Sequence, residues 1–253
     1  MALANFLFDL DGTVYRGGVA IDGAVGFINR LQKNNMQFKF ITNRSDRHSE
    51  EISMHLNKLG VLATPDLVVT SAMAMADVVK KRRVFVLGSD NLKSNIEGVG
   101  ATLTKENPDD VVVGYDGAIN FDDIGMASRK ILLGARFLAA NPDTWINSDQ
   151  GIIPENGSVL AAIKAVTNKQ PIMIGKPGPA IIELALMGSQ TDRSSTIIIG
   201  DNLNTDIAAA VALGLQSVLL LTGVTDEVTA KNSVVEPTWV AKDYERLENI
   251  IFP

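Results

Sequence analysis

Residues 6–14 read FLFDLDGTV, a short apolar run that ends in two aspartates and a glycine. The run at 6–8 is typical of a buried strand, and Gly12 allows the backbone to turn sharply where the strand ends. Asp9 and Asp11 lie two residues apart, so their carboxylates repel each other unless a cation lies between them. Mg²⁺ supplies that charge and binds one or two carboxylates. An ordinary Asp-Gly turn is the structural alternative.

Similar apolar or β-branched runs recur along the chain, with helical patterns between them. The alternation predicts an α/β fold built from βαβ units with parallel sheets. Apolar residues at helical spacing predict helices over 24–34 and 51–59. The predicted strands are residues 6–8, 38–42, 67–70, 84–87, 111–113, 136–139, 172–174, 196–199 and 217–221.

Polar residues follow the second predicted strand, which ends in TNRS. A hydroxyl from Thr42, the Asn43 amide and backbone N–H groups before a helix form a cradle suited to phosphate. Capping of the helix by Thr42, Asn43 or Ser45 is the structural alternative. Ligands bind at the carboxyl edge of open parallel sheets, which is where these residues are expected.

Lys176 lies on a stiff turn in the segment IMIGKPGP, residues 172–179. A nucleotide-binding P-loop is excluded, because that motif requires glycine in place of Gln170 and Ser or Thr in place of Pro177. A single ammonium group remains, and it either is solvated or contacts a phosphoryl oxygen.

The strand at 196–199 ends in GDNLNTDI, with Asp201 at the strand terminus and Asp206 in the following turn. An aspartate before a helix is often only a cap. Together, however, the four strand ends supply a nucleophile candidate, a proton donor, a phosphate-binding hydroxyl, a cation and a metal carboxylate. That combination favours a catalytic site over four independent structural features.

The 253-residue composition excludes several classes of protein. The formal net charge is −6, so the chain lacks the excess of basic residues expected of a protein that binds nucleic acid or anionic membranes. No cysteine is present, which excludes disulfides, thiolate metal sites and cysteine nucleophiles. No apolar run approaches the roughly 18 residues of a membrane span, and no signal peptide is recognised. A cytoplasmic protein with a small ligand is therefore expected.

The four motifs resemble those of the haloacid dehalogenase-like phosphatases: DLDGT, Thr42 in ITNRS, Lys176 in GKP, and GDNLNTD. The long insertion between Thr42 and Lys176 and the phrases TSAMA, GARFLAANPDT and ENGS resemble the NagD or 4-nitrophenylphosphatase-like branch, which has a type II cap. The resemblance covers nearly the whole chain. One departure is that members usually read TNNSS, whereas Arg44 and Asp46 flank Ser45 here.

The resemblance implies a Rossmannoid core over residues 1–71 and 172–253, with an inserted α/β cap over 72–171. It implies a phosphoric monoester hydrolase that uses Mg²⁺ and a small phosphorylated substrate such as a sugar phosphate or a nucleoside monophosphate. Asp9 is then the nucleophile and Asp11 the general acid and base.

The remaining site residues are assigned in the same way. Asp9, Asp201 and the Asp11 carbonyl hold the metal, while Lys176 and Thr42 neutralise phosphoryl charge. Asp206 acts through Lys176 or a metal-bound water, and Gly12 and Asn202 support the motifs. In the cap, the loop 141–144, with Asn141 and Asp143, is the expected specificity element, and Asn43 and Arg44 are candidate substrate contacts.

Other functions fit less well. A phospho-accepting receiver domain is near half this length and has its acceptor in a middle strand, and this alternative rests on fold-level analogy alone. A dinucleotide-binding oxidoreductase is disfavoured because Leu103 occupies the position of the third glycine after Gly98 and Gly100. A dehalogenase needs no second aspartate at the position of Asp11. Phosphotransfer to a sugar hydroxyl stays open, and the sequence does not indicate an oligomeric state.

Overall fold

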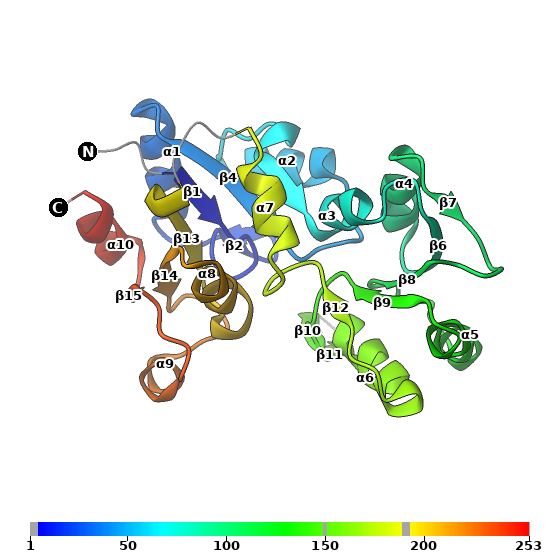
Figure 1. Cartoon of the computed structure of the whole chain (residues 1–253). Coiled ribbons are helices and arrows are strands. Elements are labelled where there is room, and N and C mark those ends of the chain that lie inside the picture. Colours follow the sequence, from blue (N-terminus) through cyan, green and yellow to red (C-terminus); the bar gives the residue numbers. More distant parts are fainter. Residues whose placement is uncertain (1–4, 149–150, 189–192, 253) are drawn as a thin grey trace. The chain divides into compact units, whose positions relative to one another are not determined.

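The computed structural model describes residues 5–148, 151–188 and 193–252, which divide into two compact units. The first unit contains residues 1–42, 49–69 and 182–253, and the second contains 43–48 and 70–181. Figure 1 shows both units in colours that follow the sequence. The predicted boundaries of the core and the cap stay a prediction.

The first unit contains a six-stranded sheet in the order β15-β14-β13-β1-β4-β5. Strand β1 lies inside the sheet and pairs in parallel with β13 on one side and β4 on the other. Its strands are β1 (Asn5–Phe8), β4 (Gln37–Thr42), β5 (Val68–Thr70), β13 (Thr196–Gly200), β14 (Gln216–Leu220) and β15 (Trp239–Ala241), with a small hairpin of β2 (Tyr15–Arg16) and β3 (Val19–Ala20).

Helical segments connect these strands. They are α1 (Ala24–Lys33), α2 (Ser49–Lys58), η1 (Pro65–Leu67), η2 (Arg193–Ser195), the π-helical turn η3 (Leu203–Ile207), α8 (Ala208–Leu213), α9 (Glu227–Asn232) and α10 (Tyr244–Ile251). Helix α7 (Ala180–Leu186) begins at the end of the second unit and continues into the first.

Aromatic side chains fill the core of the first unit around Phe8. Its ring centroid lies 6.1 Å from that of Phe27, 6.4 Å from that of Phe38 and 6.2 Å from that of Phe40. Each favourable aromatic pair contributes about 0.5–1.5 kcal/mol beyond burial. The core therefore holds β1 and β4 firmly where their carboxyl ends reach the sheet edge.

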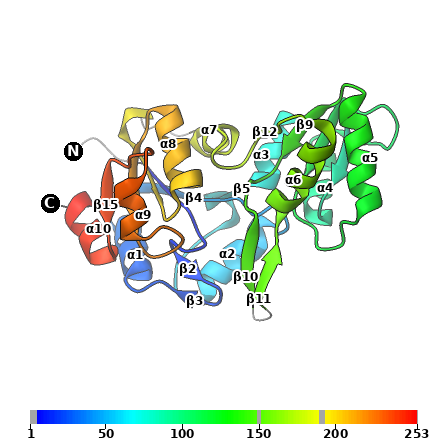
Figure 2. The same ribbon diagram turned by 90° about the horizontal axis from the view of Figure 1, so that it is seen from below.

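The second unit contains a five-stranded parallel sheet in the order β12-β9-β8-β6-β7. Its strands are β6 (Arg83–Leu87), β7 (Thr102–Leu103), β8 (Asp110–Val113), β9 (Arg136–Ala139) and β12 (Ile172–Met173). Its helices are α3 (Ser71–Val78), α4 (Asp90–Gly98), α5 (Phe121–Leu132) and α6 (Asn156–Thr167). Strands β10 (Trp145–Ser148) and β11 (Gly151–Pro154) form an antiparallel hairpin that is clear in Figure 2.

The predicted α/β class is confirmed, and every strand predicted from an apolar run has a counterpart in the structure. The sequence patterns missed β7, β15 and the two hairpins. Within the described ranges, none of the helices has the length and apolar content that a bilayer crossing requires.

Candidate active site

Neighbouring parallel strands of the first unit bring three polar side chains to one sheet edge. Phe8 is level with Ile199 on β13 and with Phe40 on β4. Asp9 follows Phe8 directly, and its N–H donates to the Ile199 carbonyl at 2.8 Å. Asp201 and Thr42 each lie two residues beyond the partner of Phe8. The register therefore gathers Asp9, Asp201 and Thr42 at the carboxyl edge, where the sequence predicted them.

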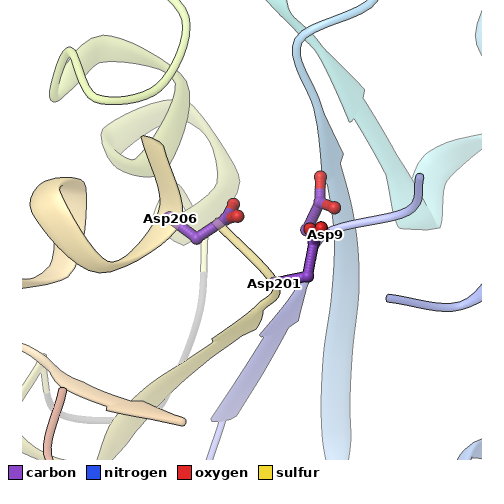
Figure 3. Close-up of side chains that lie close together, drawn as sticks. All are labelled: Asp9, Asp201 and Asp206. Carbon is purple, nitrogen blue, oxygen red and sulfur yellow. The ribbon is translucent and has the colours of Figure 1, made fainter. Parts of the chain in front are cut away.

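Three buried carboxylates converge at this edge. Asp9, Asp201 and Asp206 each offer one oxygen, and these oxygens lie within 4.8 Å of one another. Figure 3 shows the three side chains gathered at the ends of β1 and β13. Buried carboxylates this close are strongly unfavourable unless a cation binds between them. An all-oxygen set of this kind suits Mg²⁺, which takes carboxylates and waters. The donor set fits a divalent metal.

Asp201 is held by hydrogen bonds from parts of the chain far from it in sequence. Its Oδ2 accepts the N–H of Val224 at 2.6 Å, and its Oδ1 accepts the Thr13 hydroxyl at 3.4 Å. Two glycines make room for this carboxylate. An added Cβ at Gly223 would lie 1.8 Å from Oδ2, and one at Gly12, where φ is 86°, would lie 2.5 Å away. The orientation of Asp201 thus depends on both loops.

Asp206 lies in η3 and turns back toward the end of β13. Its Oδ2 accepts the N–H of Asn202 at 3.2 Å and the Thr205 hydroxyl at 3.3 Å. An added Cβ at Gly200 would lie 2.3 Å from the Asp206 Cγ. Asp206 therefore packs directly against the strand and offers an oxygen to the carboxylate cluster. Its supporting role, expected from the sequence, stays a prediction.

Asp11 is exposed, in contrast to Asp9, and lies in the turn after β1. The turn is closed by the Gly12 N–H, which donates to the Tyr15 carbonyl at 2.8 Å. The buried Tyr244 hydroxyl donates to the Thr13 carbonyl at 3.0 Å. Burial, with a further contribution from the charge of Asp9, raises the pKa of Tyr244 well above its usual value, so the phenol remains a donor. The hydrogen bond from Tyr244 thus anchors the turn that carries Asp11.

Lys176 lies in the second unit and is 2% exposed. Its carbonyl accepts the Asn43 side-chain amide at 3.0 Å. An added Cβ at Gly175 would lie 2.1 Å from the Ala140 carbonyl oxygen, which explains the glycine before this lysine. The segment is packed against the end of β9, so the turn predicted from the sequence is rigid and the lysine is not a solvated surface residue.

The expected specificity loop is also part of the second unit. Asn141 is buried and donates to Asp143 Oδ2 at 2.8 Å, and Asn43 donates to the same oxygen at 3.3 Å. Arg44 forms an ion pair with Asp46 at 3.5 Å. The structure thus brings Asn43 together with Asn141 and Asp143, which the sequence singled out in a separate loop.

Several site residues were missed in the sequence. Thr13, Val224 and Tyr244 hold the carboxylates or the Asp11 turn, and Glu155 accepts the Asn141 amide at 3.2 Å. The only signals were the threonine within DLDGT and the glutamate within ENGS. The catalytic, metal-binding and substrate-binding roles of the predicted residues stay predictions.

Two family models match the chain on either side of its middle part. A model described as haloacid dehalogenase-like hydrolase covers residues 6–102, and a HAD-hydrolase-like model covers residues 173–247. The matched segments contain the Asp9 turn and the Asp201 turn respectively.

Relatives match along almost the whole length. An acid sugar phosphatase of Staphylococcus saprophyticus is 35% identical, over 94% of each chain. A 5'-nucleotidase of Bacillus subtilis is 35% identical, over 92% of this chain and 93% of the other.

Solved structures agree with these matches. A 4-nitrophenylphosphatase of Thermotoga maritima has a TM-score of 0.89 at 30% identity and covers 98% of this chain and 97% of its own. A glycerol phosphate phosphatase of Mycobacterium tuberculosis, in complex with magnesium, has a TM-score of 0.88 at 33% identity, over 96% of this chain and 76% of its own.

Proposed function

Because the chain belongs to the haloacid dehalogenase-like hydrolases and is a phosphatase of the NagD and 4-nitrophenylphosphatase branch, we propose that it hydrolyses a small phosphomonoester through an aspartyl-phosphate on Asp9, with Mg²⁺ as cofactor. The observation that carries the proposal is the convergence of the buried Asp9, Asp201 and Asp206 carboxylates. Their arrangement needs a cation, and phosphoryl transfer uses one.

Asp9 is the nucleophile of the first step. One of its carboxylate oxygens forms a bond to phosphorus in line with the leaving oxygen, and the bond from phosphorus to that oxygen breaks. Asp11 donates a proton to the leaving alkoxide. The exposed position of Asp11, on a turn anchored through Thr13, suits a group that must exchange protons with substrate and water.

Water completes the reaction. Asp11, now a carboxylate, takes a proton from a water molecule that attacks the phosphorus of the aspartyl-phosphate. Inorganic phosphate leaves and both aspartates return to their first state. Thr42 and Lys176 neutralise charge on the phosphoryl oxygens. Bound Mg²⁺ supplies further neutralisation of that charge, and Asp9, Asp201, Asp206 and the Asp11 carbonyl are the groups that would hold it.

The substrate is a small sugar phosphate or nucleoside monophosphate. Residues 72–171 carry 11 Lys and Arg against 12 Asp and Glu, so the segment offers no basic surface for a polyanion. The names of the acid sugar phosphatase and the 5'-nucleotidase point to the same two classes of ester. Asn43, Arg44, Asn141 and Asp143 are the residues proposed to contact the leaving group.

A phosphate-release screen tests this function. Purified protein is incubated with a panel of sugar phosphates, nucleoside monophosphates and 4-nitrophenyl phosphate, in Mg²⁺ or in EDTA. We expect release in Mg²⁺ from a subset of the panel, loss of release in EDTA, and no release by Asp9→Asn, which cannot attack phosphorus. Adding glycerol or a free sugar as acceptor separates hydrolysis from phosphotransfer. Full turnover by Asp9→Asn or in EDTA contradicts the proposal.

A further inference from the structure

Glu155 occupies the N-cap position of α6, and its side chain is partly buried. Its Oε2 accepts the N–H of Asn156 at 2.7 Å and the side-chain amide of Asn141 at 3.2 Å. A serine or aspartate is the more usual cap at a helix start. The longer glutamate side chain caps the helix and also reaches the loop that begins at Asn141.

Asn141 connects two carboxylates. Its Nδ2 has two hydrogens, and it donates to Asp143 at 2.8 Å and to Glu155 at 3.2 Å. The side chain is 3% exposed, so it has no freedom to exchange these partners for water. Asp143 is also held by Asn43, at 3.3 Å. The contacts form one chain from Glu155 through Asn141 to Asp143 and Asn43.

The backbone of this loop is held independently of the Glu155 carboxylate. The Glu155 N–H donates to the Thr144 carbonyl at 3.0 Å, and the Gly157 N–H donates to the Asp143 carbonyl at 2.7 Å. The Ser158 hydroxyl adds a third bond, to Thr144 at 2.7 Å. These backbone bonds do not depend on the Glu155 side chain, whose removal deletes the cap on the Asn156 N–H and the hydrogen bond from the Asn141 amide.

Burial and neighbouring negative charges disfavour the ionised form of Glu155. Burial raises the pKa of Glu155, and the nearby negative charges of Asp143 and Asp46 raise it further, although hydrogen bonds from Asn156 and Asn141 act in the opposite direction. Arg44 forms an ion pair with Asp46. Acids whose pKa is perturbed by burial and by neighbouring charges cluster at functional sites.

We propose that Glu155 is a positioning residue for substrate binding: it orients Asp143, through the shared Asn141 amide, toward the leaving group of the phosphomonoester. The role rests on the proposed function and adds to it a residue outside the four catalytic motifs. Asp143 Oδ2 is occupied by two amide donors, which leaves Oδ1 to accept a hydrogen bond from a hydroxyl or amino group of the substrate. The orientation of Asp143 should not affect the affinity for substrates that lack such a donor.

Steady-state kinetics of Glu155→Ala, Glu155→Gln, Asp143→Ala and the double variant Asp143→Ala/Glu155→Ala test the role. The control is Glu97→Gln, on an exposed position of α4 in the same unit. For the best metabolite substrate we expect Glu155→Ala to raise KM roughly tenfold with kcat nearly unchanged, since one oriented hydrogen bond is lost. Glu155→Gln keeps an acceptor oxygen and should restore most of the affinity. KM for 4-nitrophenyl phosphate, which has no donor group, should stay near the wild-type value.

The double variant separates positioning from folding. If Glu155 acts through Asp143, the loss in Asp143→Ala/Glu155→Ala equals that in Asp143→Ala alone. Additive losses, an equal loss on 4-nitrophenyl phosphate, or a fall in kcat with unchanged KM overturn the role of Glu155. A wild-type protein that releases phosphate from no ester overturns the proposed function and this role together, whereas an active protein with unaltered variants overturns only the role.

Discussion

Asp11 differs from Asp9 in its exposure and lies on a turn rather than against the strand, which matches a group that moves protons. We expect Asp11→Asn to fold and to bind metal, because its backbone carbonyl is unchanged. A 4-nitrophenolate leaves without much protonation, so the first step should slow less with 4-nitrophenyl phosphate than with a sugar phosphate. Hydrolysis of the aspartyl-phosphate still lacks its base, so rapid-quench kinetics should show an initial burst.

The size of the rate loss in Asp11→Asn also tests its role as acid and base. A single general-acid or general-base role accounts for roughly 10² to 10⁴-fold in rate. Equal first-step losses on both esters, with no burst, would make Asp11 a structural turn residue.

Gly223 is the residue whose replacement most directly displaces a carboxylate. An alanine Cβ would lie 1.8 Å from Asp201 Oδ2, so either the loop or Asp201 must move. A displacement of about 1 Å at a catalytic group costs on the order of 10²-fold in rate. We expect Gly223→Ala to lose about that much kcat/KM and to need more Mg²⁺ for half-maximal rate.

Gly18→Ala is the matched control, because an added Cβ there meets nothing within 4 Å. The measurement is the Mg²⁺ concentration that gives half-maximal rate. Equal values for Gly223→Ala and Gly18→Ala would contradict the expected displacement of Asp201.

At the scale of elements, Asp110 joins three strands of the second unit. It begins β8, is fully buried, and accepts hydrogen bonds from Arg82, which precedes β6, and from Arg136, which begins β9. Burial alone raises the pKa of Asp110, but the hydrogen bonds and charges of Arg136 and Arg82 outweigh it and hold the pKa below its usual value.

The direction of this shift sets a pH dependence. Because the pKa of Asp110 is lower in the folded state, its ionisation stabilises the fold at pH values above the ordinary aspartate pKa. This contribution is lost as the pH falls through the pKa of the folded state. Asp110→Asn should therefore destabilise the protein by about 1–3 kcal/mol at pH 7, since the two arginines are partly exposed. The difference from wild type should shrink below about pH 4.

Thermal melts followed by circular dichroism at pH 7 and at about pH 3, below the ordinary aspartate pKa, measure this difference in stability. Asp77→Asn, at an exposed position of α3, is the control. A deficit of Asp110→Asn that is independent of pH would assign the loss to packing and not to the ion pairs.

At the scale of the molecule, we expect metal binding and folding to be coupled, because the three carboxylates come from two separate parts of the sequence. They can bind one ion only in the folded chain. An ion at about one hundred times its Kd stabilises the folded state by about 2.7 kcal/mol. We expect Mg²⁺ to raise the melting temperature by roughly 5–10 °C.

Asp201→Asn should abolish this shift, while Asp22→Asn, at an exposed position, should retain it. Calorimetry or dye-based melts over a Mg²⁺ series give the measurement. A wild-type melting temperature that does not depend on Mg²⁺ would contradict the assignment of these carboxylates to a metal.

The sequence by itself determined the α/β class, the main strands and the strand ends at which Asp9, Thr42 and Asp201 lie. These inferences depend on local patterns: apolar runs predict strands, and parallel strands bring their carboxyl ends to one edge. The family resemblance, carried by the same motifs, is confirmed by the matched models and relatives.

Only the tertiary structure decided which groups contact one another at that edge. Asp201 is held by Val224 and Thr13, and Glu155 reaches Asp143 through Asn141. Residues 43–48 belong with the second unit because the Ser45 carbonyl accepts hydrogen bonds from Ser89 and Asn91, more than forty residues away. No local pattern encodes such pairs, because the direction of a side chain depends on the packing of segments that are distant in the sequence.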